Sequence, residues 1–346
     1  MSAINHTFPS DLLSEGSNQT HLDDKVVDNM KQLIVNAFRD NGVAVSLVSY
    51  VVSLTVVRFE LIPDEGSKLE LIRSYEDKLN ETLSEYGPIR LIAPVPAKGT
   101  IAVEVPRIDR QIIRLREVLE SKEFQESNAH LPIALGVDSE NKTIVADLAK
   151  IPHLLIAGAT GIGKSVLLNN IILSLLYRLS STDLRLVLID PKGVELTPFE
   201  KIKDRYLLQF GENSPEVITD TSKVPNILTS IDNEVQNRYN LFRKIGCRTI
   251  REYNQKIAEG KQKSNQLSHL PYIIVVVDEF ADLIVKHGKD FEIPLLHITQ
   301  KGRAAGIHVI ISTQRPTTDA ITGIIKTNFR LELPLRLIRQ MTPEQF

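Results

Sequence analysis

The sequence predicts an α/β fold in which a domain built on a parallel sheet follows a small α+β domain. Three features carry this prediction. A glycine-rich loop lies between an apolar strand and a helix, further short apolar strands alternate with helices, and two carboxylates directly follow one of those strands. Short strands that are apolar throughout are typical of a parallel sheet covered by helices on both faces.

The glycine-rich loop at 158–165 matches the phosphate-binding pattern G-x-x-x-x-G-K-[ST] at every fixed position. An apolar run at 153–157 precedes it, and apolar residues at helical spacing follow from 166 to 179. Glycines let backbone N–H groups turn toward an anion, and a helix N-terminus adds a partial positive charge. The alternative is a glycine-rich turn that binds nothing. We expect the loop to hold ATP through Gly158, Ala159, Thr160, Gly161, Ile162, Gly163, Lys164, Ser165 and Val166.

Particular roles follow for two of these residues. Lys164 is expected to reach the β- and γ-phosphates, and the Ser165 hydroxyl is expected to ligate Mg²⁺. ATP and Mg²⁺ are therefore the expected cofactors.

Carboxylates and other polar residues end the apolar strands. Asp278 and Glu279 follow the run 272–277, at the sheet edge where parallel strands gather functional groups. Asp278 is expected to hold Mg²⁺ or its water, and Glu279 to polarise the attacking water. A solvated acidic turn is the alternative. Asp190 ends another strand and either supports the site or forms a plain turn. Thr313 and Gln314 are candidates to hydrogen-bond the γ-phosphate or the catalytic water and to report hydrolysis.

Bulk composition restricts the function without choosing it. The 346 residues are enough for two or three domains, and a net charge of −2 means that any nucleic acid is held by a local basic lining. Basic residues cluster after Gln300, and on composition alone ordinary solvated surface charge is the favoured interpretation of them. The single cysteine, Cys247, is interpreted as a bystander and is consistent with a cytoplasmic location. No signal peptide or membrane span is predicted, and 43–57 is interpreted as one or two buried strands.

Four segments are expected along the chain. Residues 1–24 form a disordered tail, 25–106 a small α+β domain, 107–129 a connecting helix, and 130–346 the nucleotide-binding domain. Strands of the last domain are predicted at 154–157, 184–189, 272–277 and 307–312, with a long helix at 224–244 between them.

Five collinear segments together resemble the FtsK/SpoIIIE family of double-stranded DNA translocases. The upstream segments 55–61 and 145–148 resemble the family's α-domain and the entry to its β-domain, so that the likeness covers about 25–330. The five segments are 153–165, 189–192, 277–282, 300–308, and 313–316 together with 321–328.

The resemblance implies a RecA-like ATPase motor domain that assembles as a homo-hexameric ring around double-stranded DNA. Each ATP site would then lie between subunits, with Arg303 as an arginine finger reaching a neighbour's γ-phosphate. Arg315 and Lys326 match loops that grip the DNA backbone, and Gln314 gains support as a sensor.

The sequence also departs from the family pattern. Ile162 stands where the family usually has a small residue, and the match fades beyond Arg330. The motor domain is therefore expected to be C-terminally incomplete, with neither a winged-helix γ-domain nor an N-terminal membrane anchor. Two alternatives remain open. One is the ATPase subunit of a secretion or conjugation coupling complex, and the other is a truncated ATP-binding subunit that is not a motor.

Overall fold

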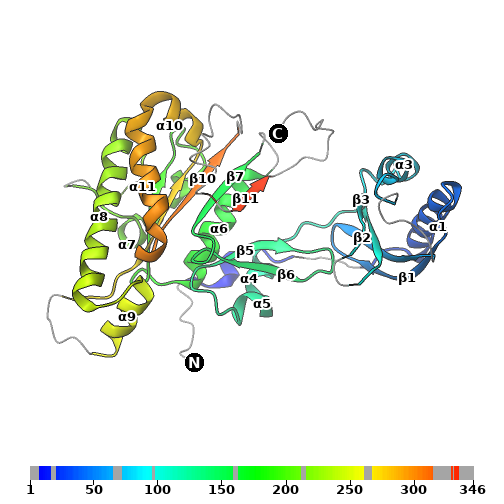
Figure 1. The fold of residues 1–346 in the computed structure, drawn as a ribbon, viewed down its shortest axis with the longest axis horizontal. Helices are drawn as coiled ribbons and strands as arrows, with labels where there is room; N and C mark the ends of the chain where they lie inside the picture. The colour runs from blue at the N-terminus through cyan, green and yellow to red at the C-terminus, as the bar shows by residue number, and fades with distance from the viewer. Residues whose placement is uncertain are drawn as a thin grey trace. The chain divides into compact units, whose positions relative to one another are not determined.

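The computed structural model describes residues 8–16, 21–64, 72–95, 98–158, 163–211, 216–260, 267–314, 329 and 331–334, the last four by their backbone. Internal contacts divide the chain into two compact units (Figure 1). The N-terminal unit comprises 10–126 and 136–144, and the P-loop unit comprises 1–9, 127–135 and 145–346. The segment expected to connect two domains, up to residue 126, clusters with the N-terminal unit. None of the described helices is long and apolar enough to cross a membrane.

The N-terminal unit is an antiparallel sheet with helices packed on one face. Its strands run in the order β1 (Val45–Val52), β2 (Val56–Pro63), β4 (Ile101–Pro106) and β3 (Arg90–Ile92). Helix α1 (Asp24–Asp40) begins after Asp23, whose carboxylate accepts a hydrogen bond from the backbone of Lys25. Apolar residues of α1 and α3 (Glu76–Thr82) pack against Val57, Phe59 and Leu61 of β2. This face of the sheet forms the core of the unit.

The valine-rich stretch 43–57 forms β1 and enters β2, but β1 is less buried than its composition predicts. Val48, Tyr50 and Val51 are 53%, 47% and 38% exposed. The reason is topological, because β1 is the edge strand of its sheet and has a neighbouring strand on one side only. Apolar composition predicts a strand, but it does not reveal whether that strand lies at the edge of its sheet.

The remaining elements of the N-terminal unit are short. They include η1 (Ser10–Leu12), α4 (Leu115–Glu120) and α5 (Lys122–Gln125). A hairpin of β5 (Pro132–Val137) and β6 (Thr143–Asp147) contributes its tip to the unit. At the tip, the Asn141 side chain accepts a hydrogen bond from Leu54 N at 3.0 Å and donates to Val52 O at 3.3 Å. These bonds fasten the tip to the β1–β2 turn.

The P-loop unit contains a five-stranded parallel sheet, as the sequence predicts. The strand order is β11 (Leu331–Pro334), β7 (His153–Ala157), β10 (Ile307–Thr313), β9 (Tyr272–Val277) and β8 (Leu184–Ile189). The four predicted strands match within one residue at each end. Strand β11 was not predicted, and it lies just beyond Arg330, where the family match was expected to fade.

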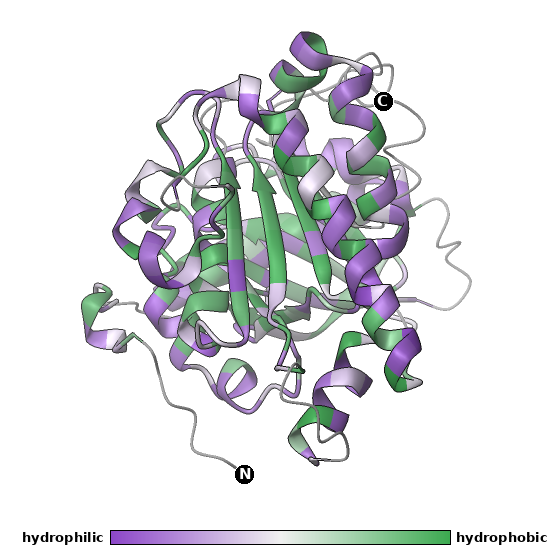
Figure 2. Ribbon diagram, turned by 90° about the vertical axis from the view of Figure 1, so that its left-hand side faces the viewer, coloured by the Kyte–Doolittle hydropathy of each residue, from purple (hydrophilic) through white to green (hydrophobic). Residues whose placement is uncertain are grey.

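Helices cover both faces of this sheet. Leu155, Val275 and Val309 belong to the core that includes α8 (Val224–Ile245), α10 (Phe280–His287) and α11 (Lys289–Ala305). The alternate residues Leu154 and Ile274 belong to the core that includes α6 (Lys164–Arg178). Burial on both faces makes the strands apolar throughout, and Figure 2 shows their hydrophobic colouring beside helices of mixed colour. The unit also contains η2 (Thr197–Ile202), α7 (Lys203–Tyr206), η3 (Thr221–Lys223) and α9 (Ile250–Ala258).

Candidate nucleotide-binding site

The carboxyl ends of four neighbouring strands bring the predicted site residues together. In the parallel register, Thr313 of β10 pairs with Ala157 of β7, and Val277 of β9 pairs with Ile189 of β8. Each strand therefore ends at the same sheet edge, where ligands bind in α/β proteins. Gly158 N donates a hydrogen bond to Thr313 O at 3.1 Å, which ties the start of the glycine-rich loop to the end of β10.

The centre of the site is an ion pair between Lys164 and Asp278. Lys164 Nζ lies 2.9 Å from Asp278 Oδ1, and the two residues are only 5% and 3% exposed. Ser312, on the neighbouring strand β10, donates from Oγ to the same carboxylate oxygen at 2.5 Å. Removing one partner of a buried ion pair typically costs about 3–5 kcal/mol, because the other charge is left without compensation. Lys164 and Asp278 therefore depend on each other.

Glu279 is held in an unusual backbone conformation. Its φ of 46° and ψ of 56° lie in the left-handed region, which costs a residue other than glycine about 1–3 kcal/mol. Its side chain accepts hydrogen bonds from Thr313 Oγ1 at 3.1 Å and from Gln314 N at 3.2 Å. Lys164 Nζ lies 3.8 Å from Glu279 Oε2. The end of β10 thus fixes the carboxylate on which the predicted water activation depends.

Asp190 makes the contacts of a turn-forming residue. Its buried carboxylate accepts backbone N–H bonds from Lys192 at 3.2 Å and from Gly193 and Leu196 at 2.9 Å each. Of the two interpretations that the sequence leaves open, these contacts match the turn. The turn carries Lys192, whose Nζ lies 3.7 Å from Glu279 Oε2.

The glycine-rich loop enters α6 through Gly163, whose φ of 96° favours glycine. Ser165 follows in the first turn of the helix and is half-buried, whereas Val166 is exposed. Residues 159–162, with the predicted contacts of Ala159, Thr160, Gly161 and Ile162, lie outside the described residues. Arg315 and Lys326 also lie outside them.

Arg303 is not brought to the carboxylates of its own chain. It is exposed in the last turn of α11, just before the first residue of β10, while Thr313 ends that strand at the site. A seven-residue strand spans roughly 20 Å at about 3.3 Å per residue. Arg303 and the site therefore lie at opposite edges of the sheet.

The junction that carries Arg303 is tightly packed. A Cβ on Gly302 would lie 2.4 Å from Ile307 O, and Gly306 has a φ of 74° with Ile250 against it. The buried Arg238 of α8 donates hydrogen bonds to Ala305 O and Pro271 O, both at 2.9 Å. These contacts explain the two glycines and hold the end of α11 in place.

Two buried histidines lie on the strands but away from the carboxylates. Burial lowers the pKa of His153 to about 3 and that of His308 to about 4. Both side chains are therefore neutral at physiological pH. His308 Nδ1 donates to Pro152 O at 3.0 Å, and His153 Nδ1 accepts from Val309 N at 3.1 Å. They serve the packing between β7 and β10.

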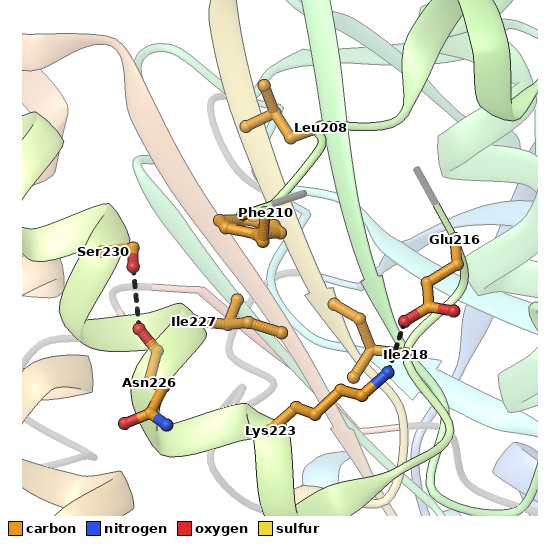
Figure 3. Close-up of a pocket in the computed structure, with 9 residues that line it drawn as sticks. Leu208, Phe210, Glu216, Ile218, Lys223, Asn226, Ile227 and Ser230 are labelled. Atoms are coloured by element: carbon orange, nitrogen blue, oxygen red, sulfur yellow. Dashed lines mark hydrogen bonds and ion pairs between the residues drawn. The ribbon is translucent and has the colours of Figure 1, made fainter. Parts of the chain in front are cut away.

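A cavity of about 290 Å³ lies beside β8 and the start of α8 (Figure 3). Phe210, Ile218 and Ile227 form apolar walls, and Lys223 pairs with Glu216 at 2.7 Å along one side. None of the predicted nucleotide-binding or catalytic residues that the structure describes lines it. Ile218, on its wall, pairs with Ile189 at the end of β8.

The sequence did not reveal the roles of Ser312 and Lys192, nor that Thr313 contacts Glu279. Ser312 and Thr313 supply hydroxyl donors to Asp278 and Glu279, and Lys192 supplies a second cation. The available signal was that polar residues end the strands on both sides of β9. The alignment of these particular side chains depends on register, which the sequence alone does not specify.

Comparisons with known proteins agree with this geometry. The FtsK/SpoIIIE family matches residues 114–318, and the FtsK alpha domain matches residues 8–107. The DNA translocase FtsK of Chlorobaculum tepidum is 39% identical over 330 residues, which cover 94% of this chain and 40% of that protein. The DNA translocase FtsK of Haemophilus influenzae is 39% identical over 335 residues, covering 92% and 62%. The DNA translocase SftA of Bacillus subtilis is 38% identical over 337 residues, covering 97% and 34%. The chain thus spans about a third to two-thirds of the length of these relatives.

Solved structures share the fold. The pCW3 conjugation coupling protein TcpA, in a monomer form with ATPgS, aligns with a TM-score of 0.51 at 24% identity, covering 88% of this chain and 83% of that one. The cytoplasmic domain of the type VII secretion ATPase EccC of Thermomonospora curvata aligns with a TM-score of 0.50 at 24% identity, covering 60% and 24%. At these identities the likeness shows an α/β P-loop ATPase fold and nothing finer.

Proposed function

Because the chain belongs to the FtsK/SpoIIIE family, we propose that it is an ATP-driven motor that moves double-stranded DNA. The observation that carries the proposal is the cluster of Lys164, Asp278 and Glu279 where the glycine-rich loop meets the ends of β9 and β10. The named DNA translocases that resemble this chain do so across both units, which supports DNA as the cargo.

Lys164 serves the phosphates of ATP in this proposal. Its ammonium group carries three donors, of which one now faces Asp278 Oδ1. The helix that begins at Lys164 also offers backbone N–H groups to an anion. Bound phosphate would add acceptors for a cation that is otherwise committed to the carboxylates.

Asp278 and Ser165 fit a magnesium ion bound together with nucleotide. Asp278 Oδ1 is engaged by Lys164 and Ser312, whereas Oδ2 makes no hydrogen bond within the described part of the chain. A carboxylate oxygen and a hydroxyl are ligands that Mg²⁺ takes beside phosphates and water. The described residues hold no cluster of three or more His, Cys, Asp or Glu side chains for a metal, so phosphate oxygens would complete the set. When bound, Mg²⁺ would neutralise charge on the phosphate oxygens.

Glu279 is the proposed acceptor of the proton from the attacking water. Its carboxylate is buried and oriented by Thr313 and by the backbone of Gln314. A general base has to be held within reach of the proton it removes, and a rigid strand end does so better than a free loop. Gln314 joins this carboxylate to the chain that leads to Arg315, so it remains the proposed sensor.

Ring assembly accounts for the position of Arg303. A guanidinium at the sheet edge opposite its own carboxylates cannot act on its own nucleotide, but it can face the site of a neighbouring copy. An arginine supplied in trans can raise the rate of phosphoryl transfer by about 10³–10⁵-fold. We therefore propose a homo-hexameric ring in which Arg303 completes the next subunit's site, and in which Arg315 and Lys326 contact the DNA backbone.

Subunit mixing tests the trans role of Arg303. Arg303→Ala and Lys164→Ala should each be inactive alone, because each lacks one half of every site. A mixture contains some interfaces with an intact Lys164 and an intact Arg303, and it should regain part of the activity. Arg251→Ala, another exposed arginine of this unit, is the control and should remain active. A mixture as inactive as its parts, with assembly intact, contradicts the trans assignment.

The proposed function is tested by steady-state ATP hydrolysis with and without linear double-stranded DNA, at low and moderate salt. The expected result is stimulation by duplex DNA that weakens as salt rises, because phosphate contacts release counterions. Displacement of a third strand from a triplex then tests movement. ATP binding without DNA stimulation would instead favour a secretion or coupling ATPase, or a subunit that is not a motor.

A further inference from the structure

A second lysine borders the Glu279 carboxylate. Lys192 Nζ lies 3.7 Å from Glu279 Oε2 and 4.0 Å from Asp282 Oδ2. Its side chain is 47% exposed, whereas that of Glu279 is 3% exposed. Lys192 thus reaches from the surface toward a carboxylate in the interior.

The backbone beneath Lys192 is firmly anchored. Asp190, which is fully buried, accepts hydrogen bonds from Lys192 N, Gly193 N and Leu196 N. Gly193 adopts a φ of 66°, which lets the chain turn sharply directly after the lysine. The side chain therefore starts from a backbone that the end of β8 fixes beside β9.

The charges around the site suggest why a second cation is present. Asp278 and Glu279 are adjacent and buried, and Lys164 is close to both of them. When Lys164 serves the phosphates, Lys192 is the cation that remains within 4 Å of Glu279 among the described residues. Thr313 and Gln314 contribute neutral donors, which orient the carboxylate but do not balance its charge.

We propose that Lys192 is a positioning residue that holds the Glu279 carboxylate in its reactive orientation while Lys164 is engaged with phosphate. Lys192 acts through Glu279 rather than on the nucleotide, so its loss affects turnover and not binding. The inference rests on the proposed ATP hydrolysis, and it adds a residue to that site.

Lys192→Met removes the ammonium group and keeps most of the side-chain length. We expect kcat for ATP hydrolysis to fall roughly tenfold to a hundredfold, since small displacements of a catalytic group cost rates of this order. KM and the dissociation constant for a fluorescent ATP analogue should change by less than about twofold, as expected when ground-state binding is untouched. Lys192→Arg keeps the charge and should restore most of kcat.

Lys223→Met is the matched control. Lys223 is 43% exposed and also forms an ion pair, with Glu216 at 2.7 Å, but it lines the cavity and pairs with neither Asp278 nor Glu279. Its loss should leave kcat unchanged. The melting temperature of both variants should match that of the unaltered protein, because both side chains are half-exposed.

Three results would overturn the inference. Unchanged kcat in Lys192→Met shows that Glu279 does not need the second cation. A weaker affinity for the nucleotide analogue shows that Lys192 contacts the nucleotide instead. Lys192→Arg as slow as Lys192→Met shows that charge is not what matters. If the unaltered protein binds ATP but does not hydrolyse it with or without DNA, that result contradicts the proposed function itself. The positioning role of Lys192, which rests on hydrolysis, is then contradicted as well.

Discussion

Each unit contains one residue other than glycine in the left-handed region of backbone space, within the described part of the chain, and the two residues differ in kind. Asn141, in the N-terminal unit, has a φ of 63°, and its side chain bonds to the backbone of the β1–β2 turn. Glu279, in the P-loop unit, has a φ of 46°. Asparagine adopts this conformation readily, whereas glutamate does so much less often. Asn141 therefore marks an ordinary turn, whereas Glu279 is a strained position that carries a proposed catalytic group.

The charged side chains of the two units show a second contrast. In the N-terminal unit, Arg58 of β2 pairs with Glu104 of β4 at 3.1 Å, and Lys98, in the turn before β4, pairs with Glu60 of β2 at 3.1 Å. In the P-loop unit, Lys164 and Lys192 instead meet Asp278 and Glu279 at a single edge of the sheet. Antiparallel neighbours end at opposite edges, but parallel neighbours end together. Strand direction therefore decides which unit can assemble a site from strand ends.

The largest expected effect is on ATP turnover, and it distinguishes the pair Lys164–Asp278 from the pair Lys98–Glu60. Lys164→Ala should lower ATP turnover by about 10²–10³-fold or more, as when one preorganised donor to a transition state is lost. Lys98→Ala, which breaks the exposed pair with Glu60, should leave turnover unchanged. Steady-state hydrolysis with duplex DNA measures both. Equal activity of the two variants would remove the distinction between the units.

The next comparison is between the stability contributed by the buried Arg238 and that contributed by Arg116. Arg238→Ala leaves the carbonyls of Pro271 and Ala305 without their donor, and it should lower the free energy of unfolding of the P-loop unit by about 3 kcal/mol. Arg116→Ala in the N-terminal unit breaks pairs of a half-buried arginine with the exposed carboxylates of Glu15 and Glu120, and it should lower stability far less than Arg238→Ala does. Hydrogen exchange followed by mass spectrometry reports on each unit separately. A stable Arg238→Ala protein would show that water replaces the arginine.

Acid should destabilise the P-loop unit selectively. Burial holds the pKa values of His153 and His308 at about 3 and about 4, below the ordinary histidine value near 6.5. Below pH 6.5 these two histidines therefore bind protons in the unfolded chain but stay neutral in the folded chain. This stability is present in full above pH 6.5 and is lost as the pH falls toward the folded values. From pH 7 to 5.5 we expect a loss of about 2 kcal/mol, measured by urea unfolding.

The N-terminal unit provides the control for this pH effect, since its described residues include no buried histidine. Its hydrogen exchange, corrected for intrinsic pH dependence, should show no matching loss of protection. Equal destabilisation of both units would mean that another group causes the acid response.

The smallest effect concerns Asn141. Asn141→Ala should destabilise the N-terminal unit by roughly 1–2 kcal/mol, through backbone strain and two lost hydrogen bonds. Asn141→Gly relieves the strain and should cost less. Faster hydrogen exchange at the β1–β2 turn is the readout, with ATP turnover unchanged in both variants. An alanine variant more stable than the glycine variant would contradict the role of strain.

The sequence predicts those parts of the fold that depend on local pattern. The parallel strands, the helix after Lys164 and the carboxylates after β9 follow from apolar periodicity and from the loop motif. The exposure of β1 could not be predicted, because it depends on an edge position that composition does not encode. Strand β11 was missed because its four residues carry little pattern of their own, and pairing with β7 stabilises them.

The site residues also fall into those that local sequence pattern predicts and those that depend on the folded neighbours. Lys164 and Asp278 were predicted from motifs, but the contacts of Ser312, Thr313 and Lys192 depend on which strands are neighbours. Asp190 illustrates the limit, because an acidic residue at a strand end suits a metal site and a turn equally well in sequence. Its three backbone partners distinguish the two only in the folded chain.

The carboxylate of Glu279, which is carried on a strained backbone, is proposed to perform chemistry, whereas a buried carboxylate of the N-terminal unit does not. The most direct measurement is duplex-stimulated ATP hydrolysis by Glu279→Gln beside Glu104→Gln, which alters a carboxylate that is 9% exposed and paired with Arg58. We predict that Glu279→Gln binds nucleotide normally but hydrolyses it about 10²–10⁴-fold more slowly, while Glu104→Gln keeps full activity. Glu279→Gln turning over ATP at the rate of the unaltered protein would contradict the claim.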